Sequence, residues 1–228
     1  MDILLIAGLW LDGSSWNSVA AELGELGHRA VPITLPGQGD GNTSATLPDQ
    51  IATVLAAVDA AEAKPLVVGH SAACNLAWLA ADARPDKISK VALIGGFPSG
   101  DGSPYFADLP IQDGALAFPG WAMFEGPDSA DLDDAAKQAF TAAAIPLPEG
   151  VARGEIRLAD QRRYEMPVVL ICPEFSPGQA KEWIGNGQIP ELAKSTNLSY
   201  VDIDSGHWPM ITAPAELARI LSRVAQEP

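Results

Sequence analysis

One stretch of the chain, Leu66–Ala73, reads LVVGHSAA. Its first three residues predict a buried strand that turns at Gly69, and the apolar spacing that follows predicts a helix over 72–83. A serine flanked two positions away by small residues, between a strand and a helix, is typical of a nucleophile elbow. Gly69 and Ala73 meet this requirement, so we expect the Ser71 hydroxyl to stand above the sheet. A serine that only caps the helix is the alternative interpretation.

Short apolar runs alternate with helical patterns on both sides of this stretch. Apolar residues at helical spacing predict helices over 16–26, 48–58 and 214–224, and the further predicted strands are 3–7, 29–35, 91–94, 168–171 and 200–203. These strands are apolar throughout instead of alternating, which indicates a sheet covered on both faces. We therefore predict an α/β fold with a mostly parallel six-stranded sheet. Functional residues in such folds follow the carboxyl ends of the strands.

The segment 97–164 breaks this alternation between the fourth and fifth predicted strands. We predict no strand in it and a helix over 132–144. Aromatic side chains accompany nine acids and one lysine between Asp101 and Gly150. We interpret the segment as a cap over the strand ends, so that residues 1–96 and 165–228 form the core. A surface insertion without a functional role is the alternative.

Composition and charge restrict the partners of the protein. The chain has 228 residues, 47% of them hydrophobic and 19% charged, which excludes a disordered protein. Its net charge of −15 disfavours nucleic acid and anionic membranes, so we expect a small-molecule substrate and leave a homodimer open. Two well-separated cysteines and an N-terminus unlike a signal peptide predict a cytoplasmic protein. The sequence shows no metal-ligand cluster or phosphate-binding loop, so we expect no metal and no cofactor.

A serine nucleophile needs a base, and the chain has three histidines. His28 lies at a predicted helix end, and the side chain of His70 is expected to point away from its neighbour Ser71. His207 follows the sixth predicted strand and precedes the last helix. This position is at the same edge of the sheet as Ser71, so we predict His207 as the general base.

Over essentially its whole length the chain resembles the α/β-hydrolase fold superfamily, and it is similar to the small members such as plant methyl esterases and hydroxynitrile lyases. The resemblance rests on Gly8, Trp16, the LPGQG stretch from Leu35, the GHS stretch from Gly69, and Gly206-His207. It implies a serine esterase-like mechanism with Ser71 as nucleophile and His207 as base. It also implies an oxyanion hole formed by the backbone N–H groups of Leu9 and Ala72.

Two positions depart from the family pattern. The family usually has His-Gly after the first strand, whereas this chain has Ala7-Gly8. The family tends to place the triad aspartate after the fifth strand, where this chain offers Glu174. We predict Glu174 as the acid that orients His207, with Asp101 and then Asp204 as alternatives.

Four aromatic residues are candidates for an apolar substrate pocket: Trp10, Trp121, Phe124 and Trp208. The hydroxynitrile lyases carry lysine directly after the catalytic histidine, and Trp208 stands there in this chain. The sequence therefore favours an esterase acting on a small, mostly apolar ester. The alternatives are a lyase or cyclase of secondary metabolism, or a binding protein on a degenerate hydrolase scaffold.

Overall fold

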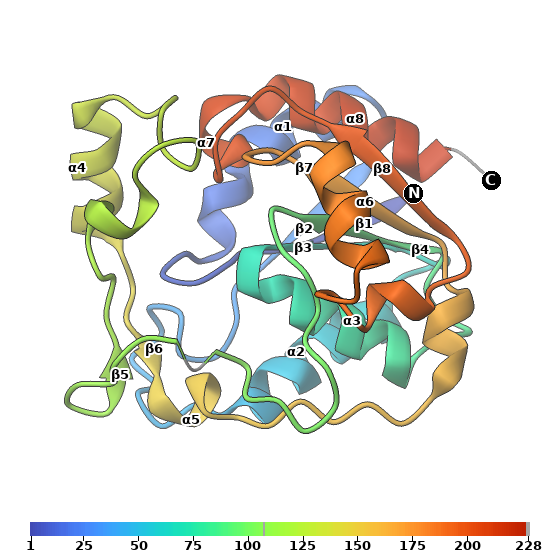
Figure 1. The fold of residues 1–228 in the computed structure, drawn as a ribbon, viewed down its shortest axis with the longest axis horizontal. Coiled ribbons are helices and arrows are strands. Elements are labelled where there is room, and N and C mark those ends of the chain that lie inside the picture. The colour runs from blue at the N-terminus through green and yellow to red at the C-terminus, as the bar shows by residue number, and fades with distance from the viewer. Residues whose placement is uncertain (107, 227–228) are drawn as a thin grey trace.

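A single parallel sheet organises the computed structural model, which describes residues 1–106 and 108–226 (Figure 1). Ala107 of the predicted cap and residues 227–228 of the predicted core lie outside the described residues. The strand order is β2-β1-β3-β4-β7-β8, and every neighbouring pair is parallel. The predicted six-stranded sheet is thus confirmed. Its strands are β1 (Asp2–Ile6), β2 (Arg29–Ile33), β3 (Leu66–His70), β4 (Lys90–Ile94), β7 (Val168–Cys172) and β8 (Leu198–Asp202).

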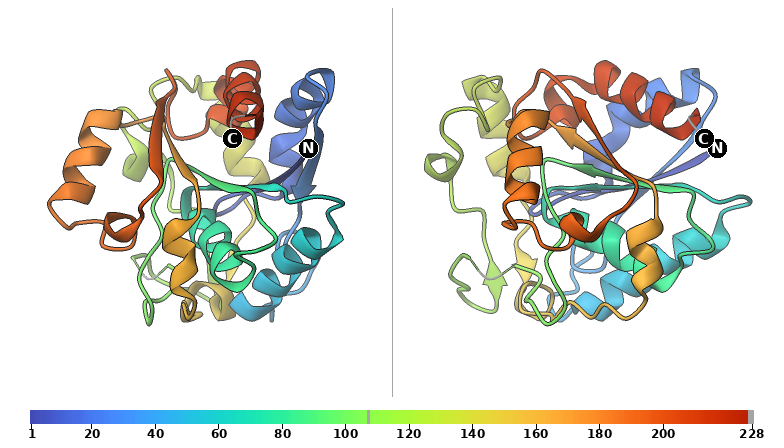
Figure 2. Two further views of the ribbon diagram at one scale, coloured as in Figure 1. Left: turned by 90° about the vertical axis from the view of Figure 1, so that its right-hand side faces the viewer. Right: turned by 45° about the vertical axis from the view of Figure 1, so that its right-hand side comes forward.

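Helices cover both faces of this sheet, as Figure 2 shows. Helices α1 (Asn17–Glu25) and α8 (Pro214–Gln226) pack together on one face, and α2 (Leu47–Ala60) and α3 (Cys74–Ala83) pack together on the other. Helix α6 (Pro177–Gly185), which the sequence did not predict, packs beside β7 and β8. None of the helices in the described residues combines the length and apolar character needed to cross a bilayer.

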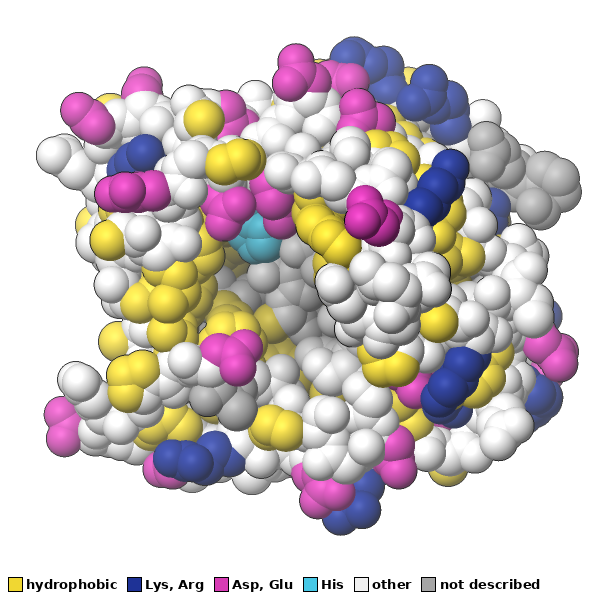
Figure 3. All heavy atoms as spheres, viewed as in Figure 1, with side chains coloured by type: hydrophobic (Ala, Val, Ile, Leu, Met, Phe, Trp, Pro, Cys, Tyr) yellow, Lys and Arg dark blue, Asp and Glu magenta, His cyan; other side chains and the backbone are white. Residues whose placement is uncertain are grey.

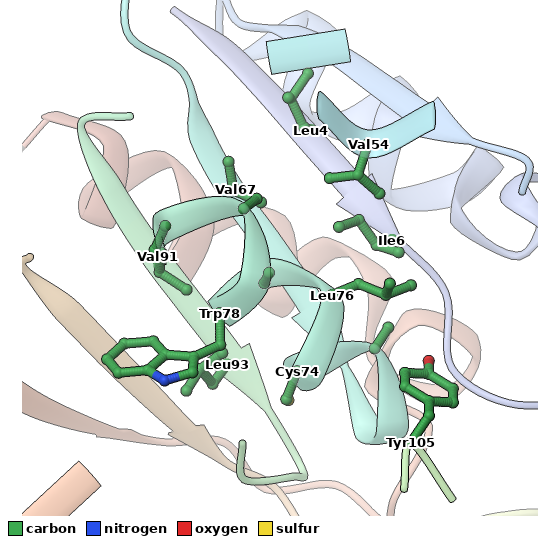
Figure 4. Close-up of a cluster of buried hydrophobic side chains, with 14 of the residues drawn as sticks. Leu4, Ile6, Val54, Val67, Cys74, Leu76, Trp78, Val91, Leu93 and Tyr105 are labelled. Atoms are coloured by element: carbon green, nitrogen blue, oxygen red, sulfur yellow. The ribbon is translucent and has the colours of Figure 1, made fainter. Parts of the chain in front are cut away.

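The internal strand β1 shows why residues 3–6 are apolar throughout: successive side chains enter opposite cores. In β1, Leu4 and Ile6 belong to the core cluster of α2 and α3, whereas Ile3 and Leu5 belong to that of α1 and α8. All four are essentially inaccessible to solvent. Figure 4 shows the first cluster, where side chains of β1, β3 and β4 meet those of α2 and α3. Burial on both faces explains why the four residues after Asp2 in β1 are all apolar.

The segment between β4 and β7 is built from short elements: β5 (Ala115–Leu116), η3 (Trp121–Phe124), α4 (Asp134–Ala143), β6 (Leu147–Pro148), α5 (Glu149–Ala152) and η4 (Gln161–Glu165). The prediction that this segment contains no strand is wrong, because β5 and β6 form an antiparallel pair. Two-residue strands are too short to show a sequence pattern.

The two halves of this segment pack differently. Near α4, the Ile145 amide donates to the Trp10 carbonyl oxygen beyond the end of β1, so this half lies at the carboxyl edge of the sheet. Further along, Val151 and Ala152 are completely buried, and the carboxylate of Asp82 on α3 accepts from the Ala159 amide at 3.0 Å. The second half is therefore packed along the α2–α3 side of the core.

Candidate active site

The elbow after β3 differs from the sequence prediction in its start. Strand β3 continues through Gly69 to His70, and the 3₁₀ turn η2 (Ser71–Ala73) then leads into α3. Ser71 has φ 55°, in the left-handed region that side chains rarely adopt. A Cβ at Gly69 would collide with the carbonyl oxygen of Ala73, and a Cβ at Gly96 would lie 2.5 Å from that of Ser71. The tight turn thus depends on glycine in both β3 and the loop after β4.

Three side chains from three loops form a chain of hydrogen bonds at this edge of the sheet. The Ser71 hydroxyl lies 2.9 Å from His207 Nε2, and His207 Nδ1 lies 2.8 Å from Glu174 Oε1. The side chains of His207 and Glu174 are 12% and 13% exposed, so they are largely shielded from water. With its proton on Nδ1, His207 donates to the carboxylate and accepts at Nε2 from the serine hydroxyl.

The two alternative acids lie elsewhere. Asp101 Oδ1 accepts a hydrogen bond from the Leu158 amide at 2.8 Å, and the side chain of Asp204 is exposed on the loop after β8. Of the three candidate carboxylates, the structure brings Glu174 to His207.

A second carboxylate lies near Glu174, one that sequence reasoning did not single out. Burial and the neighbouring charge of Glu174 raise the pKa of Asp128. The other oxygen of the glutamate, Oε2, is buried and accepts no hydrogen bond from the described residues. A Cβ at Gly95 would lie 3.2 Å from this oxygen and 3.3 Å from His207 Nδ1. Glycine at the end of β4 therefore leaves room for the longer glutamate side chain.

His70 contacts His207, the histidine of the hydrogen-bonded series, and the sequence did not predict this contact. Its Nε2–H donates to the backbone carbonyl oxygen of His207 at 2.7 Å, and the two ring centroids are 4.9 Å apart. Burial lowers the pKa of His70 to about 3, with the nearby His207 contributing. His70 is therefore neutral at physiological pH, and its hydrogen bond holds the backbone of His207. A histidine beside an elbow serine was the only sequence signal for it.

The predicted oxyanion residues flank the elbow. Ala72 lines the same cavity as Ser71, and Leu9 is buried on the loop after β1. A Cβ at Gly8 would lie 2.9 Å from the Cβ of Ser71, so this loop closely approaches the serine. The next residue, Trp10, has φ 65° and donates from its indole Nε1 to the Leu116 carbonyl oxygen at 3.2 Å. The first half of the segment between β4 and β7 therefore anchors the predicted oxyanion loop.

The four predicted pocket aromatics pack against one another. Ring centroids are 5.3 Å apart for Trp121 and Trp208, 5.2 Å for Phe124 and Trp208, and 5.9 Å for Trp10 and Phe124. Trp10 and Trp208 are buried, and the ring of Phe124 stacks over that of His207 at 6.4 Å. This cluster packs beside the ring of His207. Its role toward a substrate stays a prediction.

A cavity of about 520 Å³ opens at Ser71, and none of these four aromatic residues is among its lining residues. Sequence reasoning did not find its lining, which combines ring side chains with small polar groups; it includes Asn75, Phe97, Ser99, Ser103, Tyr105, Phe106 and Asp108. Figure 3 shows the hollowed face of the molecule, with acidic side chains beside a histidine and hydrophobic side chains along the hollow. Within residues 1–106 and 108–226, no group of three or more His, Cys, Asp or Glu side chains could hold a metal ion.

A comparison of the sequence with models of protein families agrees with the fold and the elbow described above. Residues 3–220 match the model of the alpha/beta hydrolase family. The match covers nearly the whole chain, and the structure has the parallel six-stranded sheet that was predicted. The chain therefore belongs to the alpha/beta hydrolase family. A search of curated proteins found no match to the sequence.

Solved structures with the same fold cover the chain from end to end. An extracellular alpha/beta-hydrolase from a Paenibacillus species has 19% identity and a TM-score of 0.81, with 100% of both chains covered. A pyrethroid hydrolase from Sphingobium faniae has 20% identity and a TM-score of 0.74, covering 100% of this chain and 98% of that one. A methylesterase from Arabidopsis has 16% identity and a TM-score of 0.75, covering 98% of each chain. At these identities the likeness establishes the fold alone.

Proposed function

We propose that this protein is a serine hydrolase that cleaves a small, mostly apolar carboxylic ester. The observation that carries the proposal is the hydrogen-bonded series in which Ser71 Oγ lies 2.9 Å from His207 Nε2 and Glu174 Oε1 lies 2.8 Å from His207 Nδ1. A serine, an imidazole and a carboxylate in this arrangement are the parts that acyl transfer requires. The left-handed backbone of Ser71 supports the same conclusion, because such strain is typical of functional positions.

In the proposed reaction, Ser71 Oγ attacks the ester carbonyl carbon while His207 Nε2 takes the hydroxyl proton. Glu174 holds the proton on Nδ1 and stabilises the imidazolium that forms. The N–H groups of Leu9 and Ala72 would stabilise the oxyanion. The imidazolium then protonates the leaving alcohol. A water, deprotonated by His207, then attacks the acyl carbon. As the bond from the acyl carbon to Ser71 Oγ breaks, the imidazolium returns the proton to Ser71 Oγ, and the carboxylic acid is released.

The cavity beside the serine supports an ester of modest size. Its volume of about 520 Å³ is in the range of sites for small molecules. Phe97, Tyr105 and Phe106 supply apolar surface, and the acidic Asp108 disfavours an anionic substrate. Two proteins with the same fold are described as a pyrethroid hydrolase and a methylesterase, which is consistent with ester cleavage.

The test compares the wild-type protein with Ser71→Ala on short-chain p-nitrophenyl esters. We expect kcat to fall by roughly 10³-fold or more, because triad members act as a unit. Circular dichroism should show that the variant still folds. A fluorophosphonate probe should label the wild type and leave the variant unlabelled, since only an activated serine reacts. Unchanged turnover in Ser71→Ala would reject the acyl-enzyme mechanism, and a wild type that neither turns over nor labels would favour the lyase or binding-protein alternatives.

A further inference from the structure

The loop that carries His207 is attached to the segment between β4 and β7. The His207 amide donates to the Asp128 carbonyl oxygen at 2.8 Å, and the ring of Phe124 stacks over the imidazole. We call residues 124–131 the clamp loop and residues 205–207 the base loop. The clamp loop thus contacts the loop that carries the proposed catalytic base.

Asp131 makes the strongest of these contacts. Its Oδ2 accepts from the Gly206 amide at 2.7 Å. The Ser205 hydroxyl lies 3.3 Å from the same oxygen and 2.9 Å from the Gly206 carbonyl oxygen, so its single proton is shared between the two. The Ser205 hydroxyl also lies 3.0 Å from the Thr212 hydroxyl of α7 (Pro209–Thr212). A hydrogen bond from an amide to a carboxylate is about twice as strong as one between neutral groups. This carboxylate therefore holds Gly206, the residue that directly precedes the histidine.

The absence of a side chain at Gly206 makes this approach possible. A Cβ at Gly206 would collide with Asp131 Oδ1 and would lie 2.5 Å from the Asp128 carbonyl oxygen. Gly206 is buried, and its Cα faces the clamp loop at this close approach. Its φ is outside the left-handed region, so the glycine is required by close packing and not by backbone conformation.

We propose that Asp131 is a positioning residue for the catalytic base. By holding Gly206, it keeps His207 in line between Glu174 and Ser71. The position of the clamp loop thereby affects the catalytic geometry. The proposal rests on the proposed function for its kinetic consequences. It acts through His207, since Asp131 itself hydrogen-bonds to Gly206 of the base loop.

The kinetic test uses Asp131→Ala and the conservative Asp131→Asn on one activated ester. A displacement of a catalytic group by about 1 Å can cost on the order of 10²-fold in rate. We expect Asp131→Ala to lower kcat and the fluorophosphonate labelling rate by roughly 10- to 100-fold, with KM nearly unchanged. Asp131→Asn should recover most of the rate, because its amide oxygen can still accept from Gly206.

The matched control is Asp133→Ala, which removes a carboxylate two residues further along. Asp133 caps α4 by accepting from the Ala136 amide at 2.8 Å. This variant should be less stable through loss of the cap, yet retain wild-type kcat under conditions where it is folded. An equal loss of kcat in Asp133→Ala would overturn the proposal, because it would attribute the effect to general loosening of α4.

Amide hydrogen exchange provides a measurement that does not depend on hydrolysis. In Asp131→Ala the amides of Gly206 and His207 should exchange at least about tenfold faster, while those of β3 and β4 stay unchanged. If the wild type proves inactive, the proposed function fails and this exchange result alone decides whether Asp131 holds the base loop. Wild-type exchange at both amides in Asp131→Ala would overturn the inference, as would wild-type kcat in an active enzyme.

Discussion

Glu174 reaches His207 from the loop after β7, with its Oε1 2.8 Å from the imidazole Nδ1. Its side chain is one methylene longer than the aspartate expected at this place. Gly95, which has φ 57°, leaves the space that the longer chain occupies. The glutamate therefore makes a direct contact, although its second oxygen accepts no hydrogen bond from the described residues.

The first prediction concerns this contact. Glu174→Gln removes the negative charge that stabilises the imidazolium, so we expect kcat on an activated ester to fall by roughly 10- to 10³-fold. This is less than the ~10⁴-fold loss that follows replacement of the aspartate in a chymotrypsin-type triad. Asp101→Asn is the control, because Asp101 accepts from the Leu158 amide. A crippled Asp101→Asn beside a silent Glu174→Gln would refute the assignment.

The second prediction concerns the contact between the loop after β4 and the elbow. In Gly96→Ala the new Cβ would lie 2.5 Å from the Ser71 carbonyl oxygen. This oxygen belongs to the backbone, so a shift of the main chain is needed to relieve the overlap. We expect the free energy of unfolding to fall by about 1–3 kcal/mol and fluorophosphonate labelling of Ser71 to slow. Urea denaturation and labelling rates measure the two effects.

Gly100→Ala is the matched control, because a Cβ there has no atom within 4 Å. It should leave stability and labelling at wild-type values. Equal behaviour of the two alanine variants would show that the close approach of Gly96 to Ser71 is unimportant.

The third prediction concerns a buried ion-pair group beside α3. Arg163 is 6% exposed and pairs with Asp82 at 3.0 Å and Glu191 at 3.2 Å, whose side chains are 8% and 4% exposed. Arg163→Met leaves the buried Asp82 without a cation and leaves Glu191 with only the exposed Lys194, 3.4 Å away. We therefore expect the free energy of unfolding to fall by about 3–5 kcal/mol. Its neighbour Arg162 forms exposed pairs, and Arg162→Met should cost less than about 1 kcal/mol. Urea unfolding of both variants decides, and similar losses would contradict the prediction.

The fourth prediction concerns acid stability. Because burial lowers the pKa of His70 from 6.5 to about 3, the unfolded chain binds a proton in this interval that the native protein does not bind. Stability from this group is therefore complete above pH 6.5 and is lost as the pH falls toward 3, by up to about 1.4 kcal/mol per pH unit.

The comparison is between the wild type and His70→Gln, measured by urea unfolding from pH 4.5 to 7.5. The variant should show a shallower dependence on pH. His28, whose pKa is also lowered by burial, is present in both proteins, so the difference isolates His70. Identical pH slopes would mean that His70 is not buried as a neutral group.

The secondary structure was predictable wherever a local pattern repeats. The apolar runs of β1, β3, β4 and β7 and the periodic helices α1, α2, α3 and α8 are visible along the chain, and so is the elbow, because its small residues are neighbours. Helix α6 was missed, although Ser176 and Gln179 form a capping box at its start. The two-residue strands β5 and β6 carry no period that a sequence can show.

The sequence by itself determined the fold class and the elbow around Ser71, because each depends on residue types in short, local patterns. It singled out His207 as the candidate base by its place after the sixth predicted strand. Only the tertiary structure decided which carboxylate meets His207, since Glu174, Asp101 and Asp204 differ in how loops distant in sequence converge at the sheet edge. The same holds for Asp131, which lies 75 residues from its hydrogen-bond donor Gly206. Contacts between distant loops depend on the geometry of the whole sheet and leave no local pattern to read.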